Sequence, residues 1–217
     1  MPSAQYKIAE TFHSVQGEGS WAGQQAFFIR FHGCNLSCEF GNGFKCDDAA
    51  HSGPDFEMLN LLELEIKARK IPNTLNVVLT GGEISLNGSI GKVVRTLKSF
   101  GFHVACETNG HLIERLKDAD LITYSPKTKW DHKARLITYE EYSEMEDGAM
   151  PPIELKLLAG AQDTPDKIWE SYPMKYVQAI GNEHDFDEAN MNACIAWVIA
   201  NPDWHLSTQL QKLYGVR

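Results

Sequence analysis

The sequence predicts an α/β protein whose parallel sheet forms either a partial, open barrel or a doubly wound sheet. Short apolar runs of strand type alternate with stretches that carry apolar residues at helical spacing along most of the 217 residues. Strands separated by helices favour parallel pairing with right-handed crossovers. The six or seven such units are too few for a closed barrel of eight strands. In either architecture, ligands are expected at the carboxyl ends of the strands.

The first half of the chain is expected to contain two strands and two helices. Residues 26–31 (AFFIRF) and 76–80 (NVVLT) are short apolar runs of strand type. Residues 56–70 carry apolar side chains at helical spacing, with Asp55 as the expected N-cap. Residues 90–100 form the second expected helix.

The second half continues the alternation after a polar interruption. The expected strands are residues 102–107, 121–124, 153–158, 176–180 and 204–207. The expected helices are residues 112–117, residues 164–170 with Thr164 as N-cap and Pro165 at the first position, and residues 187–200. A more polar segment extends from Lys127 to about Pro152.

The composition indicates one globular domain over residues 1–217. The chain is 43% hydrophobic and 23% charged, and its length suits a single domain. A net charge of −9 gives no basic surface for sequence-independent binding to nucleic acid or anionic membranes. The sequence contains no apolar run of about 18 residues, and its N-terminus lacks the basic-then-apolar order of a secretory signal. We therefore expect a cytoplasmic protein with reduced thiols.

Three of the five cysteines, Cys34, Cys38 and Cys46, follow the first predicted strand with the spacing C-x3-C-x7-C. In a reducing compartment such crowding indicates metal ligation rather than disulfides. Thiolates select zinc or iron–sulfur clusters. Zinc would need a fourth ligand, for which His32 and His51 are candidates, whereas a four-iron cluster on three cysteines keeps one iron open. Three buried, unligated cysteines are the remaining alternative.

The other two cysteines are expected to be core residues. Cys106 lies in the predicted strand at residues 102–107, and Cys194 lies in the predicted helix at residues 187–200. Because a buried free cysteine behaves as a small apolar side chain, neither is expected to bind metal.

The strand followed by cysteines resembles the cluster loop of the radical S-adenosylmethionine (SAM) superfamily, where three cysteines hold a 4Fe-4S cluster and the fourth iron binds SAM. The usual spacing there is C-x3-C-x2-C. Here Gly41 stands at the third position and Cys46 follows five residues later. The intervening Gly-Asn-Gly consists of residues that favour turns, so this stretch can form a loop between the ligands. The resemblance implies a single radical SAM domain, a partial βα barrel with about six parallel strands, and cluster ligands Cys34, Cys38 and Cys46.

The segment before the cysteines resembles one particular family within this superfamily. Residues 13–19 (HSVQGEG), together with residues 28–30 (FIR) and 33–36 (GCNL), resemble the opening of 7-carboxy-7-deazaguanine synthases. Taken alone, QGEG is equally a polar hairpin turn. In the family, a pterin edge meets the amide and carboxylate of this turn, and the substrate carboxylate suits a guanidinium. The implied substrate-binding residues here are Val15, Gln16, Gly17, Glu18, Arg30 and Thr80.

Motifs at the ends of later strands extend the resemblance. Residues 80–83 (TGGE) correspond to the superfamily GGEP, with Ile84 in place of proline. Residues 107–110 (ETNG) and 125–127 (SPK) match family motifs, and Gln178 corresponds to the glutamine of a QP segment. Each motif alone is an ordinary strand-end turn, but their shared order favours one family. The implied SAM-binding residues are Gly82, Glu83, Glu107, Asn109, Ser125, Pro126, Lys127 and Gln178.

The C-terminal residues 205–217 resemble the family ending, which folds over the substrate and contributes its terminal carboxylate. Gln211 stands where the family has histidine. An amide can replace a hydrogen bond but not a titratable function. The resemblance therefore adds Gln211 and Arg217 to the implied substrate site.

One further position concerns magnesium. After the third cysteine the family has Asp-Thr, whose threonine helps to bind Mg²⁺, and this chain has Asp47-Asp48. A carboxylate is a suitable oxygen ligand for Mg²⁺, so Asp48 is the candidate ligand. A solvated loop acid is the alternative.

The resemblance implies a radical SAM carbon–nitrogen lyase that converts 6-carboxy-5,6,7,8-tetrahydropterin to 7-carboxy-7-deazaguanine with loss of ammonia, as in queuosine-type biosynthesis. The implied cofactors are a 4Fe-4S cluster, SAM and Mg²⁺. A flavodoxin-like external electron donor and a homodimer are also implied. The protein would position the reactants, and no catalytic side chain beyond the cluster and SAM is implied.

Two other functions stay open at the level of sequence. The first is a radical SAM activase that forms a glycyl radical on a partner protein; the QGEG opening and the C-terminal tail argue against it. The second is a binding protein that has kept the fold without turnover, which the departures at Gly41, Ile84, Ala179 and Gln211 would suit.

Overall fold

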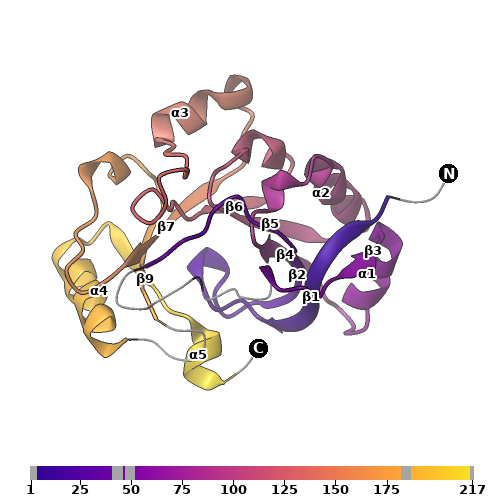
Figure 1. Ribbon diagram of the computed structural model, residues 1–217, viewed down its shortest axis with the longest axis horizontal. Helices are drawn as coiled ribbons and strands as arrows, with labels where there is room; N and C mark the ends of the chain where they lie inside the picture. Colours follow the sequence, from indigo (N-terminus) through magenta and orange to yellow (C-terminus); the bar gives the residue numbers. More distant parts are fainter. Residues whose placement is uncertain (1–3, 41–45, 47–51, 182–186, 216–217) are drawn as a thin grey trace.

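The computed structural model describes residues 4–40, 46, 52–181 and 187–215 (Figure 1). These residues form a nine-stranded sheet in the order β3-β1-β2-β4-β5-β6-β7-β8-β9. Figure 1 shows α1 and α2 beside the end of the sheet that contains β1 to β5, and α4 beside β9 at the other end.

The elements are bounded as follows. The strands are β1 (Tyr6–Val15), β2 (Gln25–Phe31), β3 (Glu57–Leu59), β4 (Asn76–Gly81), β5 (His103–Thr108), β6 (Leu121–Tyr124), β7 (Ile153–Ala159), β8 (Lys175–Ala179) and β9 (Trp204–Ser207). The α-helices are α1 (Leu61–Ala68), α2 (Ile90–Ser99), α3 (Tyr139–Glu144), α4 (Glu188–Ala200) and α5 (Leu210–Tyr214). Short 3-10 turns are η1 (Gly19–Trp21), η3 (Ile84–Leu86), η4 (Ile113–Leu116), η5 (Met145–Gly148) and η6 (Lys167–Trp169).

Most of the sheet is parallel. From β2 through β4 to β9, every pair of neighbouring strands runs parallel. At one edge, β1 pairs antiparallel with both β2 and β3. The prediction of an α/β protein with a mostly parallel, open sheet is thus confirmed. The antiparallel edge was not predicted.

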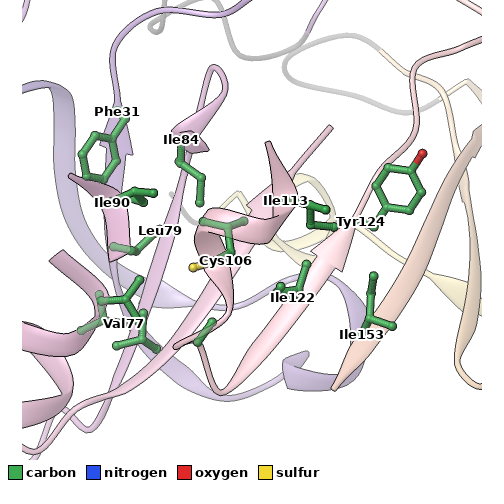
Figure 2. Close-up of a cluster of buried hydrophobic side chains, with 14 of the residues drawn as sticks. Phe31, Val77, Leu79, Ile84, Ile90, Cys106, Ile113, Ile122, Tyr124 and Ile153 are labelled. Carbon is green, nitrogen blue, oxygen red and sulfur yellow. The ribbon is translucent and has the colours of Figure 1, made fainter. Parts of the chain in front are cut away.

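The two faces of the sheet differ in chemistry because successive side chains of a strand point to opposite sides. One face carries the apolar core, and Figure 2 shows its members from four neighbouring strands, Val77, Leu79, Cys106, Ile122, Tyr124 and Ile153. The opposite face is polar near the carboxyl ends of the strands. We call this the polar face; its side chains are Thr80, Glu107, Thr123, Glu154, Lys156, Gln178 and Ser207. Since central parallel strands are usually apolar on both sides, a polar face indicates a functional site.

The helix predicted over residues 56–70 is wrong in its first part. Residues 57–59 form β3, which pairs with β1. The helix begins after Asn60, whose side chain accepts hydrogen bonds from the backbone N–H of Leu62 and Glu63, while the Glu63 side chain accepts from Asn60. Asn60 and Glu63 thus form a capping box, and Asp55 is not the N-cap.

Two other predicted helices are single 3-10 turns. Residues 112–117 reduce to η4, and residues 164–170 reduce to η6, which Asp166 rather than Thr164 caps through the backbone N–H of Ile168. The polar segment from Lys127 contains the unpredicted α3 and η5. The remaining predicted strands and helices match the structure within two residues at each end.

None of the helices in the described part of the chain combines the length and the apolar character that crossing a bilayer requires.

Candidate functional site

The carboxyl ends of the parallel strands bring the sequence motifs together. The cysteine loop follows β2, the Gly82-Glu83 turn follows β4, Asn109 follows β5 and Ser125 follows β6. Because these strands are neighbours in the sheet, the four turns lie side by side at one edge. This is the edge at which ligands were expected.

Gly82 allows the turn after β4 to approach the cysteine loop. The backbone N–H of Glu83 donates to the carbonyl of Gly33 at 2.9 Å, and that of Gly82 donates to the carbonyl of Phe31 at 3.2 Å. A Cβ on Gly82 would overlap the carbonyl oxygen of Gly33. Only glycine therefore fits this close approach.

The buried carboxylate of Glu83 links the ends of β4 and β5. One oxygen accepts from the backbone N–H of Ser85 at 3.0 Å and from the hydroxyl of Thr108 at 2.7 Å. The other accepts from the backbone N–H of Asn109 at 2.7 Å. Because Glu83 is only 2% exposed and its carboxylate is engaged within the chain, a contact between SAM and this turn would come from the backbone.

Asn109 joins the end of β5 to the cysteine loop. Its side-chain nitrogen donates to the Oδ1 of Asn35 at 2.9 Å and lies 3.9 Å from the Sγ of Cys34. Its Oδ1 accepts from the backbone N–H of His111 at 3.2 Å. The amide is thereby oriented with its nitrogen toward the thiol.

The three predicted ligands Cys34, Cys38 and Cys46 are all partly exposed and form no disulfide. Burial raises the pKa of Cys38 to about 11; the charge of Lys127 opposes this rise, and the neighbouring thiols Cys46 and Cys34 add to it. The thiols therefore lie close enough to influence one another. A bound metal centre would reverse this effect, since metals take cysteine as thiolate.

The donor set fits an iron–sulfur cluster better than zinc. In the part of the chain that the structure describes, no three His, Cys, Asp or Glu side chains converge on a point where one ion could bind. Of the histidines considered for zinc, His32 has its Nε2 2.8 Å from the carbonyl of Gly53, and His51 lies outside the described residues. Three separated thiols, with no fourth protein ligand among the residues that the structure describes, suit a four-iron cluster with one open iron.

Cys106 and Cys194, predicted to be core residues, are both buried in the apolar cluster. Figure 2 shows the sulfur of Cys106 among the side chains of the neighbouring strands. That prediction is confirmed.

Lys127 stands beside the thiols, at the end of β6. Its ammonium donates to the carbonyl of Ser125 at 2.9 Å and to the Oγ of the same residue at 2.6 Å. Pro126 between them is buried. The SPK segment thus places one cation next to the cysteine loop.

Glu107 lies between the QGEG segment and β4. Its Oε1 accepts from the Nε2 of Gln16 at 3.1 Å, and its Oε2 accepts from the hydroxyl of Thr80 at 2.8 Å. The Oε1 of Gln16 in turn accepts from the backbone N–H of Glu18 at 3.2 Å. Three segments that are distant in sequence therefore meet on the polar face.

Glu18 and Lys156 form a buried ion pair, with side chains 11% and 8% exposed. The second carboxylate oxygen accepts from the Nε2 of Gln209 at 2.9 Å and from the Nε2 of Gln211 at 3.3 Å. Burial alone would raise the pKa of Glu18. The charge and hydrogen bond of Lys156, together with the hydrogen bonds from Gln209 and Gln211, lower this pKa to about 2. The C-terminal tail thus contacts the QGEG segment.

Gly17 makes room for this tail. Its carbonyl accepts from the backbone N–H of Leu210 at 3.4 Å. A Cβ at this position would overlap the Oε1 of Gln211, an oxygen that is buried and has no hydrogen-bond partner among the described residues.

Two further contacts complete the polar face. The carboxylate of Glu154 accepts from the hydroxyl of Thr123 at 2.8 Å and from the backbone N–H of Ser20 at 2.9 Å. The hydroxyl of Ser207 donates to the Oε1 of Gln178 at 2.7 Å. Gln178, predicted from the family to bind SAM, is therefore held against β9.

Arg30 lies on β2 opposite Thr80 of β4. Its Nε donates to the carboxylate of Glu10 at 2.8 Å, and both side chains are 21% exposed. A planar guanidinium has five donors, so this pairing is compatible with a second, anionic partner. Val15, at the end of β1, has a side chain that is 40% exposed. Asp48 and Arg217 lie outside the described residues.

Glu154, Lys156, Thr123 and Gln209 were missed in the sequence analysis. A signal was present in the strand at 153–158 (IELKLL), where Glu154 and Lys156 alternate with apolar residues. Such alternation is unusual in a parallel strand buried on both sides, and it marks a polar face.

No protein-family model matches the chain. Among curated proteins, the chain is 32% identical to a 7-carboxy-7-deazaguanine synthase of Synechocystis sp., over 98% of this chain and 94% of that protein. It is 31% identical to the protein of the same name from Bacteroides thetaiotaomicron, over 97% of this chain and 98% of that protein.

A solved structure supports the fold. The chain superposes on the crystal structure of QueE from Escherichia coli with a TM-score of 0.62, covering 94% of each chain at 23% sequence identity.

Proposed function

The chain belongs to the 7-carboxy-7-deazaguanine synthase family, and on that premise we propose that it is a radical SAM carbon–nitrogen lyase acting on 6-carboxy-5,6,7,8-tetrahydropterin. The product is 7-carboxy-7-deazaguanine, and ammonia is released. One observation supports this above the others. The polar face and the cysteine loop meet at one end of the sheet, where Glu107 and Asn109 are two residues apart on β5 and its following turn.

Cys34, Cys38 and Cys46 hold the 4Fe-4S cluster in this proposal. When bound, the cluster would supply the electron for reductive cleavage of SAM. The side chain of Asn109, held by Asn35, and the cation of Lys127 border this loop. The backbone of the Gly82-Glu83 turn, together with Ser125 and Pro126, lines the SAM side, and Gln178 closes it toward β9.

The polar face binds the pterin. Carboxylates accept hydrogen bonds, and the pyrimidine edge of a pterin presents N–H donors, so Glu18 is suited to that edge. We assign Glu107 to the same edge rather than to SAM, as the family resemblance implied, because its carboxylate contacts Gln16 and Thr80. Gln16 supplies both an acceptor and a donor. Arg30 is suited to the substrate carboxylate because its fork matches carboxylate geometry. Thr80 and Gln211 border the same space.

Further parts of the proposal rest on the family resemblance, and the cytoplasmic location and the single domain rest on composition and sequence pattern. Mg²⁺ bound at Asp48 would neutralise charge near the substrate carboxylate. An external, flavodoxin-like protein would donate the electron. The chain would act as a homodimer in the cytoplasm, with its single domain spanning residues 1–217.

The test is anaerobic reconstitution with iron and sulfide, followed by incubation with SAM, dithionite and the carboxy-tetrahydropterin. We expect 5′-deoxyadenosine together with a product that absorbs as a deazaguanine. Protein that holds about four irons per chain but forms neither compound would overturn the proposal. 5′-Deoxyadenosine without a deazaguanine would favour the activase function instead.

A further inference from the structure

Lys156 is a buried cation on the polar face for which the family resemblance gives no role. It projects from β7, and its residue as a whole is 6% exposed. Three carboxylates from different segments surround it, those of Glu18, Glu107 and Glu154, and each acts on its charge. Of these, Glu18 is its direct hydrogen-bond partner.

Burying an ammonium group is costly, and its partner repays that cost only where geometry and hydrogen bonding are good. The neighbouring residues of β7, Leu155 and Leu157, are apolar and point to the opposite, core face. Burial opposes the charged form of Lys156, yet the carboxylates hold its pKa above the usual value. The cation is therefore permanent across the physiological range.

The consequence falls on Glu18. Lys156 binds one of its oxygens, and the tail residues Gln209 and Gln211 donate to the other. A carboxylate offers about four acceptor positions, so these three donors leave about one for a ligand. Without the cation, burial would favour the protonated form, in which one oxygen becomes a donor.

We propose that Lys156 is a positioning residue that keeps the Glu18 carboxylate charged and oriented, so that its remaining acceptor position receives an N–H donor from the pyrimidine edge of the substrate. This role rests on the proposed function, because the N–H donor belongs to the pterin. It explains why one cation is buried among three carboxylates.

The other groups that face the Glu18–Lys156 pair do not replace the positive charge of Lys156. Glu107 of β5 and Glu154 of β7 are both acidic. Tyr176 of β8 lies opposite Lys156 in the sheet, and burial raises its pKa, so it is neutral. His205 of β9 is exposed and packs against Tyr176 with tilted rings whose centroids are 5.4 Å apart. Arg30 of β2, another cation on this side of the sheet, pairs with Glu10.

The test compares Lys156→Met, Lys156→Arg and Lys175→Met in the reconstituted holoenzyme. Lys175 is a matched control because it is also 6% exposed and lies on the adjacent strand β8, but it points to the core face and interacts with Glu170. For Lys156→Met we expect KM for the pterin to rise about 10-fold to 100-fold at pH 7, with a smaller change in kcat. This range corresponds to the loss of one hydrogen bond to a charged group. Lys156→Arg should recover most of the loss, and Lys175→Met should keep the wild-type KM.

The pH profile separates positioning from packing. In the wild type the pKa of Glu18 is about 2, so KM should not depend on Glu18 between pH 6 and 9. In Lys156→Met the pKa of Glu18 rises, so KM should be highest at low pH and fall toward the wild-type value as the pH increases. A folded Lys156→Met variant with wild-type KM, or with a raised KM that is flat over this range, would overturn the role of Lys156.

A second readout needs no substrate. Because the folded pKa of Glu18 is lowered, its contribution to stability is present above the unfolded pKa and is lost as pH falls. In Lys156→Met a raised pKa reverses this sign, so the variant should lose stability relative to the wild type as pH rises from 5 to 8. An equal stability difference at all pH values contradicts the proposal. Absence of wild-type turnover alongside the expected stability trend overturns the proposed function and leaves the Glu18–Lys156 coupling in place.

Discussion

Cys46 and Cys106 show how one residue type serves two purposes in this chain. Cys46 is partly exposed and lies close enough to Cys38 to act on its charge, as Cys34 and Lys127 also do. Cys106 is fully buried on β5 among apolar side chains, and burial raises its thiol pKa far above the usual value. A thiol that resists ionisation to this degree is a poor metal ligand, because metals bind the thiolate.

The contrast predicts opposite outcomes for two substitutions. Cys46→Ala should abolish the brown absorbance of the reconstituted protein, because three thiolates are needed to hold the cluster. Cys106→Ala should keep the wild-type iron content and lower the free energy of unfolding by about 1–2 kcal/mol, through the cavity it leaves. Iron analysis and denaturant unfolding measure the two effects. Full iron content in Cys46→Ala would show that another residue completes the ligand set.

At this scale the sequence predicted residue types better than their partners. Cys34, Glu18, Gln16 and Glu107 were identified from motifs, and the structure brings the last three together. Lys156 was missed because its role depends on a partner 138 residues away. No local sequence pattern can show that two residues so far apart in the chain are in contact, although the alternation within β7 indicates the polar face.

At the scale of elements, the site depends on turns packed against one another rather than on single strands. The turn after β4 rests on the start of the cysteine loop through the Glu83–Gly33 hydrogen bond. The carboxylate of Glu83 then ties the same turn to the end of β5. The position of the cysteines therefore depends on β4 and β5 as well as on β2.

Gly82 and Gly88 test this dependence. A Cβ on Gly82 would overlap the carbonyl oxygen of Gly33, whereas a Cβ on Gly88 would meet nothing within 4 Å. Gly82→Ala should displace the start of the cysteine loop and reduce the iron bound after reconstitution. Gly88→Ala should bind iron as the wild type does. The measurement is iron per chain in both variants at matched folding, judged by circular dichroism. Equal iron content in the two would mean that the cluster loop is placed independently of β4.

Regular elements with long periodic patterns were predicted well, and short ones were not. The parallel strands and α4 follow directly from apolar runs, and in the structure Asp187 caps α4. β3 has only three residues, and its pairing with β1 cannot be read from its own sequence. Residues 56–59 therefore blended into the helical pattern of α1. Likewise, η4 and η6 carry apolar spacing that suits a helix but are too short to continue one.

At the scale of the whole molecule, the two faces of the sheet have different roles: one carries the apolar core, and the other carries the candidate site. The apolar core lies on one face and is built from strands, helices and 3-10 turns across the whole chain. The charged residues of the polar face contact one another on the other side. Buried charges cost stability, and the core opposite them compensates for that cost.

This division predicts how the protein behaves without its cluster. The packing of the apolar core does not depend on the cysteine loop, because Phe31, Leu79, Cys106 and Ile122 pack with one another on the core face of the sheet (Figure 2). Chelated, iron-free protein should therefore keep the far-UV circular dichroism of the holoenzyme and unfold in one cooperative transition. Its midpoint should be lower, because a group that binds only the folded state adds to its stability. A triple variant with Cys34, Cys38 and Cys46 changed to Ala is the control, and it should match the chelated wild type. Loss of most of the helical signal in both would mean that the cluster is required for the fold, and that the polar face and the core are one cooperative unit.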